Sequence, residues 1–250
     1  MLQPIRSRME QSLMRTCRRY LLTACRDLDL ARERIAGEES AAWLERHAPM
    51  AASFSDRFAL LEHSLDAVRV DGLICEFGVY RGATINYLAA RLPGKTFHGF
   101  DSFAGLPESW RPGFDKGSFR QEQLPRVRSN VRLHNGLFDD SLPVFLMDNK
   151  EAVSFLHIDC DLHSSAKLVL DLLADRIVPG TIIQFDEFLN YPGWRLGEQK
   201  AFSEFCADWD VSVEYLGYVS RDQQLAVRIS AIGKRCHKPV QAPALAGVAG

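Results

Sequence analysis

The sequence predicts an α/β fold: a sheet of five short parallel strands, completed by a C-terminal antiparallel hairpin and preceded by a helical extension. Two patterns carry this prediction. Short apolar runs alternate with segments of helical periodicity between residues 73 and 209, as expected of a parallel sheet covered by helices on both faces. Beyond them, two strand-like runs flank the turn Ser220-Arg221-Asp222, which is typical of a hairpin.

The composition is that of an ordinary globular protein. Of 250 residues, 46% are hydrophobic and 25% are charged, which excludes a disordered or collagen-like chain. The length suits one α/β domain with an extension. We therefore expect a helical extension over residues 1–52, one domain over 53–233, and a disordered tail rich in Ala, Pro and Gly over 234–250.

Charge and cysteine content narrow the range of possible functions and compartments. The formal net charge is −2, which does not suit a general nucleic-acid binder, because such proteins gain affinity by neutralising phosphates. No apolar stretch approaches the roughly 18 residues of a membrane span. The cysteines form no C-x-x-C pair, so we expect reduced thiols and a cytoplasmic protein. They are Cys17, Cys25, Cys75, Cys160, Cys206 and Cys236.

The first fifty residues show helical periodicity. Apolar side chains recur every three or four positions at Leu2, Ile5, Met9, Leu13, Cys17, Leu21, Cys25 and Leu28. This pattern predicts a helix that packs on the main domain or on a second copy of the chain, and we expect a homo-oligomer. A basic helix lying on a membrane is the weaker alternative, because acidic residues return at Asp27 and Asp29.

The individual elements follow from the same patterns. Strands are expected at residues 73–78, 96–101, 130–134, 153–159 and 181–185, with hairpin strands at 211–218 and 224–230. Helices are expected at 54–70, 84–91, 165–176 and 198–209. The helix at 54–70 could act as a lid, and Asp71-Gly72 is a suitable stop for it.

A glycine turn follows the first strand, in Glu76-Phe77-Gly78-Val79-Tyr80-Arg81-Gly82. Gly78 and Gly82 allow a sharp bend and a close ligand, but their spacing is not the G-x-G-x-x-G of a pyrophosphate site. Glu76 would repel a phosphate and favours a ligand with a cationic end. Asp101 ends the second strand, where an acid binds both hydroxyls of a ribose. Together these features predict S-adenosylmethionine, while a purely structural glycine turn remains the alternative.

Acidic side chains follow the fourth and fifth strands. Polar residues alternate at His157, Asp159, Asp161 and His163, and continued strand geometry would place them on one face. Asp186 and Glu187 end the next strand. Carboxylates brought together repel one another unless a cation neutralises them, and Mg²⁺ favours oxygen ligands. The pattern predicts a metal site at Asp159, Asp186 and Glu187; the alternative is that these acids cap helices or pair with basic residues.

Three segments resemble the macrocin O-methyltransferase family, the TylF/MycF-like enzymes. They are Phe100-Asp101-Ser102-Phe103-Ala104-Gly105-Leu106-Pro107-Glu108, His157-Ile158-Asp159-Cys160-Asp161 and Phe185-Asp186-Glu187-Phe188. The resemblance covers roughly residues 54–230. It implies a Rossmann-like class I methyltransferase sheet, the use of S-adenosylmethionine and magnesium, and methylation of sugar hydroxyls in natural products.

The resemblance and the glycine turn together assign the site residues. The residues expected around the cofactor are Glu76, Gly78, Arg81, Gly82, Thr84, Asp101, Ser102, Asn135 and Gly136. Among them, Asp101 and Ser102 would contact the ribose, and Asn135 and Gly136 the adenine. Asp159, Asp186 and Glu187 would hold the metal. Position 163 is His where relatives commonly have Tyr, which leaves the substrate open.

The expected chemistry is transfer of a methyl group to a hydroxyl oxygen, with proton removal by Asp159, Asp161 or His163. Two loops could recognise a hydroxylated or glycosylated small-molecule acceptor. Residues 103–128 contain Trp110, and residues 188–197 contain Tyr191 and Trp194, although local packing would explain these rings equally well. Glu198 could equally be an acid of a first helical turn.

Two other functions fit parts of the pattern. A metal-dependent hydrolase would use the four residues His157, Asp159, Asp161 and His163 as a metal cluster, but it leaves the glycine turn and Asp101 unexplained. A non-catalytic scaffold would bind the cofactor and recruit a partner protein through its N-terminal helices, but it has no need of acids at all three metal positions.

Overall fold

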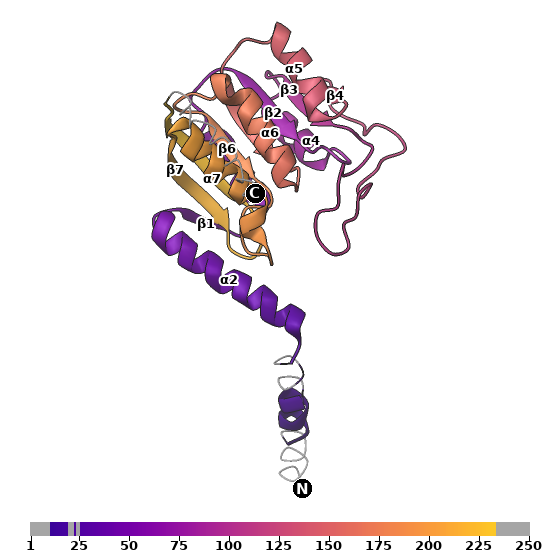
Figure 1. Cartoon of the computed structure of the whole chain (residues 1–250), viewed down its shortest axis with the longest axis vertical. Helices are drawn as coiled ribbons and strands as arrows, with labels where there is room; N and C mark the ends of the chain where they lie inside the picture. The colour runs from indigo at the N-terminus through magenta and orange to yellow at the C-terminus, as the bar shows by residue number, and fades with distance from the viewer. Residues whose placement is uncertain (1–10, 20–22, 24–25, 234–250) are drawn as a thin grey trace, which may run out of the picture.

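The computed structural model describes residues 11–19, 23 and 26–233, so the expected tail at 234–250 and parts of the N-terminal helix lie outside the described residues. A single eight-stranded sheet forms the centre of the molecule, with helices on both faces (Figure 1). Its strand order is β1-β7-β8-β6-β5-β2-β3-β4. The order reverses direction beside β2, so the carboxyl ends of β2 and β5 flank the position at which such sheets bind ligands.

The predicted parallel strands and the hairpin are both confirmed. The strands are β1 (Ala52–Phe54), β2 (Leu73–Phe77), β3 (Phe97–Asp101), β4 (Val131–Asn135), β5 (Val153–Ile158), β6 (Ile182–Phe185), β7 (Ser212–Val219) and β8 (Leu225–Ala231). Strands β6, β5, β2, β3 and β4 pair in parallel with one another in that order, and β8 pairs antiparallel with both β6 and β7. All five side chains of β2 are buried, as expected of a strand covered on both faces.

The helices form two layers over the sheet. They are α2 (Leu28–His47), α3 (Arg57–Asp66), α4 (Ala83–Arg91), α5 (Phe138–Asp148), α6 (His163–Leu173) and α7 (Glu198–Trp209). One hydrophobic cluster joins the sheet to α5, α6 and α7, with Leu170 and Phe205 fully buried. A second cluster joins the opposite face to α3 and α4 through Leu61 and Ile85. The site therefore rests on a core that is packed from both sides.

Three elements differ from the sequence-based expectation. Residues 52–54 pair with β7 as the edge strand β1, and the helix predicted over 54–70 is the shorter α3, from Arg57 to Asp66. Asp56 causes this later start, because its carboxylate accepts hydrogen bonds from the N–H groups of Phe58 and Ala59, as an N-cap does. Helix α5 was not expected, because Pro143 lies within it and proline removes a helical hydrogen bond.

Helix α2 is held by its C-terminal half. The Trp43 ring packs on Phe188 and Trp194, and the Ser40 hydroxyl accepts a hydrogen bond from the backbone N–H of Asn190 at 2.8 Å. The N-terminal half is exposed, with Leu28 at 78%, and it projects from the body together with the helical residues 11–19 (Figure 1). Within the described residues, no helix is both long and apolar enough to cross a membrane.

Candidate active site

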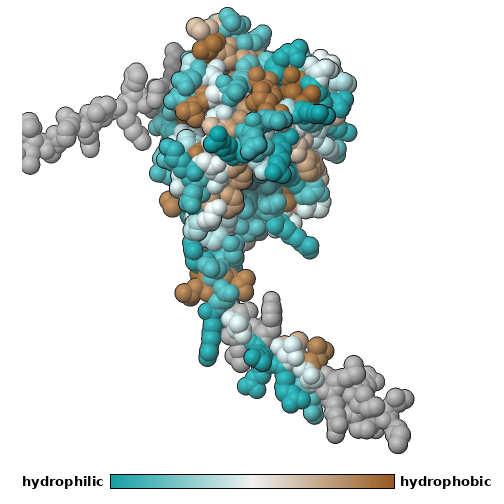
Figure 2. All heavy atoms as spheres, turned by 90° about the vertical axis from the view of Figure 1, so that its right-hand side faces the viewer, coloured by the Kyte–Doolittle hydropathy of each residue, from teal (hydrophilic) through white to brown (hydrophobic). Residues whose placement is uncertain are grey.

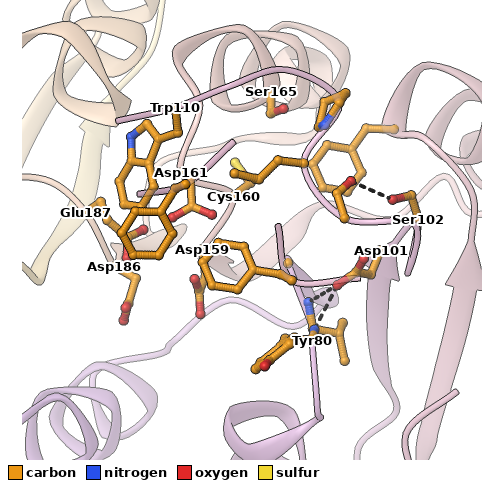
Figure 3. A pocket seen from close by; sticks show the side chains of 18 of the residues that line it. Tyr80, Asp101, Ser102, Trp110, Asp159, Cys160, Asp161, Ser165, Asp186 and Glu187 are labelled. Carbon is orange, nitrogen blue, oxygen red and sulfur yellow. Dashed lines mark hydrogen bonds between the residues drawn. The ribbon is translucent and has the colours of Figure 1, made fainter. Parts of the chain in front are cut away.

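A pocket of about 620 Å³ opens at the carboxyl ends of β2, β3, β5 and β6. Its volume is that of a small-molecule site. Figure 3 shows that its polar residues gather at two ends: Asp101 and Ser102 lie at one, and Asp159, Asp161, Asp186 and Glu187 at the other. We call these the nucleoside end and the acid end.

The glycine turn joins the two ends of the pocket. Gly78 has φ of +95°, and a Cβ placed on it would overlap the backbone carbonyl of Asp159. Only glycine therefore allows the turn after β2 to approach the end of β5. Gly82, with φ of +76°, is the N-cap of α4. The glycines have a structural role, and the turn that they form also lines the pocket at Gly78.

Asp101 fixes the shape of the nucleoside end. One of its carboxylate oxygens accepts hydrogen bonds from the N–H groups of Val79 and Tyr80, at 2.9 and 2.8 Å. The other accepts from Phe103 N–H at 2.7 Å. A carboxylate has about four acceptor positions, so one remains for a ligand hydroxyl. Asp101 both ties the glycine turn to β3 and faces the pocket.

Most of the residues predicted around the cofactor line this pocket: Gly78, Arg81, Thr84, Asp101, Ser102 and Gly136. Gly82 and Asn135 do not line it, although each adjoins or caps an element that does. The structure corrects the prediction for Glu76. Its carboxylate is 2% exposed and contacts Nδ1 of His157 at 3.1 Å, because both faces of β2 are covered.

The acid end brings together side chains from neighbouring strands. One potential ligand atom from each of His157, Asp159 and Asp186 lies within 4.8 Å of the others. Glu187 also lines the pocket. Among the described residues, Glu187 Oε2 is buried without a hydrogen-bond partner, and Asp186 Oδ1 has only His157 Nε2 near it, at 3.7 Å. Buried carboxyl oxygens without full hydrogen bonding are costly, and the carboxyl groups of Asp159, Asp186 and Glu187 are oxygen ligands of the kind that fits a divalent cation such as Mg²⁺.

The acids perturb one another strongly. Burial, together with the charge of Asp186, raises the pKa of Asp159 well above its ordinary value and does the same for Glu187. Burial also raises the pKa of Asp161 to about 7, although Arg111 opposes this rise. Perturbed acids gathered in one cleft are typical of functional sites.

His157 holds Asp186 in place from behind the pocket. Its Nε2 lies 3.7 Å from Asp186 Oδ1, and Arg57 at the start of α3 lies 3.6 Å from the other oxygen. Burial raises the pKa of Asp186, but His157 and Arg57 outweigh it and hold this pKa below its ordinary value. Burial likewise opposes the charge of His157, yet Asp186 and Glu76 raise the pKa of His157 well above normal.

His163 does not belong to the site, contrary to the expectation. It pairs with Glu204 of α7 at 2.8 Å and does not line the pocket. Strand β5 ends at Ile158 and α6 begins at His163, so the alternation of polar residues does not continue that far. The four-residue metal cluster of the hydrolase alternative therefore does not form.

The two aromatic loops differ in role. Trp110 lines the pocket, with the Arg111 guanidinium 3.8 Å above its ring centre. Phe114 and Phe119 extend this wall. In contrast, Tyr191 and Trp194 are only 4% and 1% exposed and belong to the core, so for them local packing is the correct explanation. Arg57 and Arg111 are not predictable as site residues from the sequence, because nothing in the pattern around an isolated arginine shows what it faces.

The chain is similar to known proteins in sequence and in fold. Residues 75–188 match a family model described as a methyltransferase domain. The crystal structure of CalS11, a calicheamicin methyltransferase, is similar at 24% identity, covering 68% of this chain and 76% of that one with a TM-score of 0.54. The O-methyltransferase NovP is 22% identical over 64% and 73% of the two chains, with a TM-score of 0.49. No curated protein sequence matches this chain.

Fold and site together define the class of protein. The central sheet with its antiparallel hairpin is the Rossmann-like methyltransferase fold. The segment that matches the family model begins within β2, before the glycine turn, and ends just after Asp186 and Glu187, which follow β6. Residues 75–188 match a methyltransferase domain, and the chain has the fold of a methyltransferase.

Proposed function

We propose that this chain transfers the methyl group of S-adenosylmethionine to a hydroxyl oxygen of a small molecule, and that it uses Mg²⁺. The observation that carries the proposal is the pocket with two chemically different ends. A glycine turn and Asp101 at one end suit an adenosyl ligand, while the cluster of buried acids at the other suits a cation and a reacting hydroxyl.

The cofactor fits the nucleoside end in charge as well as in shape. Asp101 faces the pocket with acceptor capacity left for a ribose hydroxyl, and Gly136 lines the wall where the adenine would lie. The sulfonium of the bound cofactor would then point toward the acid end, where the acidic side chains gather. This supports S-adenosylmethionine over a cofactor with a pyrophosphate group.

Asp159, Asp186 and Glu187 would hold the magnesium ion. The buried Glu187 Oε2, which has no hydrogen-bond partner, supports this assignment. When bound, such a cation supplies Lewis acidity that makes a neighbouring hydroxyl more acidic. His157 and Arg57 fix the Asp186 carboxylate from two sides, so the protein sets its direction before any ligand arrives.

The reaction balances as an in-line displacement. The bond between the methyl carbon and sulfur breaks, a bond from the same carbon to the acceptor oxygen forms, and the hydroxyl proton passes to a carboxylate. Asp159 and Asp161 both line the pocket and both remain candidates for this base. Holding the reactants in line supplies much of the catalysis, which can reach about 7–11 kcal/mol.

The acceptor that we propose is a hydroxylated or glycosylated natural product, methylated on a sugar hydroxyl. The resemblance to the macrocin O-methyltransferases supports it, and the wall formed by Trp110, Phe114 and Phe119 offers flat apolar rings on which a sugar or polyketide face could pack. The described cysteines are all free, which supports action in the cytoplasm.

Calorimetric titration tests the proposal. We expect the chain to bind S-adenosylmethionine, S-adenosylhomocysteine and Mg²⁺, and then to methylate members of a panel of glycosylated acceptors. Asp159→Ala should lose turnover and weaken Mg²⁺ binding while keeping affinity for S-adenosylhomocysteine. Asp175→Asn, at an exposed acid outside the pocket, is the control. Full turnover by Asp159→Ala would rule out the assignment.

A further inference from the structure

Glu198 is a buried carboxylate that touches both acid-bearing loops. It is the first residue of α7, and its side chain is completely inaccessible to solvent. Oε1 accepts a hydrogen bond from the backbone N–H of Cys160 at 3.2 Å, and Oε2 accepts one from the N–H of Glu187 at 3.1 Å. Glu198 is therefore an acid of the first turn of α7, as expected, and it also bonds two backbone N–H groups outside its own helix.

The two N–H groups belong to the loops that carry the acids. Cys160 lies between Asp159 and Asp161 after β5, and Glu187 follows Asp186 after β6. The ladder between β5 and β6 ends at the pair Ile158 and Phe185, with one further bond from Asp186 N–H to the Ile158 carbonyl. Beyond that point, among the described residues, Glu198 is the group that joins one loop to the other.

The support behind Glu198 is rigid. Helix α7 packs against α6 and buries Phe202 and Phe205 in the core. A Cβ at Gly197 would lie 2.6 Å from the Tyr191 hydroxyl, so the chain enters α7 in close contact with the loop after β6.

We propose that Glu198 is a positioning residue: it fixes the distance between the two acid-bearing loops and thereby sets the affinity of the acid end for a divalent cation. This inference rests on the cation site of the proposed function. Glu198 itself contacts neither the cation nor the cofactor. It acts on Asp159, Asp186 and Glu187 through the backbone that carries them, as outer groups of metal sites do.

Glu198→Gln is the discriminating variant. It keeps the size of the side chain but replaces one acceptor oxygen by an NH₂ group, so one of the two backbone N–H groups loses its partner. We expect Mg²⁺ affinity, measured by calorimetry, to fall about 10–100-fold, while affinity for S-adenosylhomocysteine stays unchanged. On the same helix, Glu204 pairs with His163 and Lys200, which do not line the pocket, so Glu204→Gln should change neither affinity.

Amide hydrogen exchange without magnesium tests independently whether Glu198 holds the two loops. In the wild type the N–H groups of Cys160 and Glu187 should exchange slowly, and in Glu198→Gln at least one of them should exchange faster. Fast exchange of both amides in the wild type, or wild-type Mg²⁺ affinity in Glu198→Gln, would overturn the proposal. Slow exchange in a wild type that binds no Mg²⁺ would instead reject the cation of the proposed function and leave Glu198 as a link between the loops.

Discussion

Gly78 is the residue at which the nucleoside end and the acid end of the pocket meet. Its φ of +95° and the carbonyl of Asp159, which occupies the space of a Cβ, exclude any side chain there. Asp101 then holds the same turn through the N–H groups of Val79 and Tyr80. One residue without a side chain therefore sets where the methyl donor would lie relative to the carboxylates.

Gly78→Ala should destabilise the protein by about 2–5 kcal/mol, because a left-handed backbone costs a side chain about 1–2 kcal/mol and overpacking about 1–3 kcal/mol. Urea unfolding measures this loss. Gly94→Ala is the matched control, because a Cβ there meets no atom within 4 Å and its φ is ordinary. Equal stability of the two variants would contradict the close contact between Gly78 and Asp159.

The sequence predicts those site residues that lie at the ends of strands. Asp101, Asp159 and Asp186 each follow a buried apolar run, and parallel strands must bring such positions to one edge. It does not predict Glu198, because its partners are backbone N–H groups of residues 160 and 187, far from it along the chain. His163 was misassigned because the periodicity of two was extended past the end of a strand.

At the scale of elements, β3 and β4 are joined by a pair of histidines. His98 Nδ1 lies 3.1 Å from His134 Nε2, and Phe145 of α5 packs on both rings. Burial, aided by the neighbouring His134 and Arg132, lowers the pKa of His98 to about 4. Burial also lowers the pKa of His134. Both rings favour the neutral form in the folded state.

This pair makes stability depend on pH. Between about pH 6.5 and 4 the unfolded chain protonates His98 while the folded chain does not, so the free energy of unfolding should fall as the pH drops through this window. The slope for one such group is less than about 1.4 kcal/mol per pH unit. Urea unfolding at several pH values measures it, and His98→Gln should reduce the slope. An unchanged slope in that variant would contradict the assignment.

The elements themselves were predictable where one pattern dominates. Five parallel strands and the hairpin follow from apolar runs and turn residues, and their bounds agree within about two residues. Strand β1 was missed because three residues carry no periodicity, and its pairing with β7 is a contact made across the whole chain. Helix α5 was missed for a different reason. The packing of Leu142 and Phe145 in the core outweighs the unfavourable effect of Pro143 on a helix.

At the scale of the whole molecule, the described part of the N-terminal extension before Ala36 projects away from the core (Figure 1). Figure 2 shows apolar side chains on the part that projects from the body. The exposed apolar residues there are Leu13, Met14, Leu28, Leu30 and Ile35. A helix that packs on nothing is marginally stable in water, and unburied apolar surface favours association. We therefore propose that the extension packs against a second copy of the chain.

Removing residues 1–35 tests this proposal without disturbing the pocket, because the lining residues begin at Arg57 and Trp43 stays in place to hold α2 on the body. The full chain should have the mass of a dimer or a larger oligomer by light scattering, and the shortened chain that of a monomer with unchanged affinity for S-adenosylhomocysteine. Removing residues 234–250 instead should leave the mass of the assembly close to that of the full chain. A full chain that is monomeric at micromolar concentration would contradict the proposal, and so would a shortened chain that still associates, since the exposed apolar side chains of the extension would then have no part in assembly.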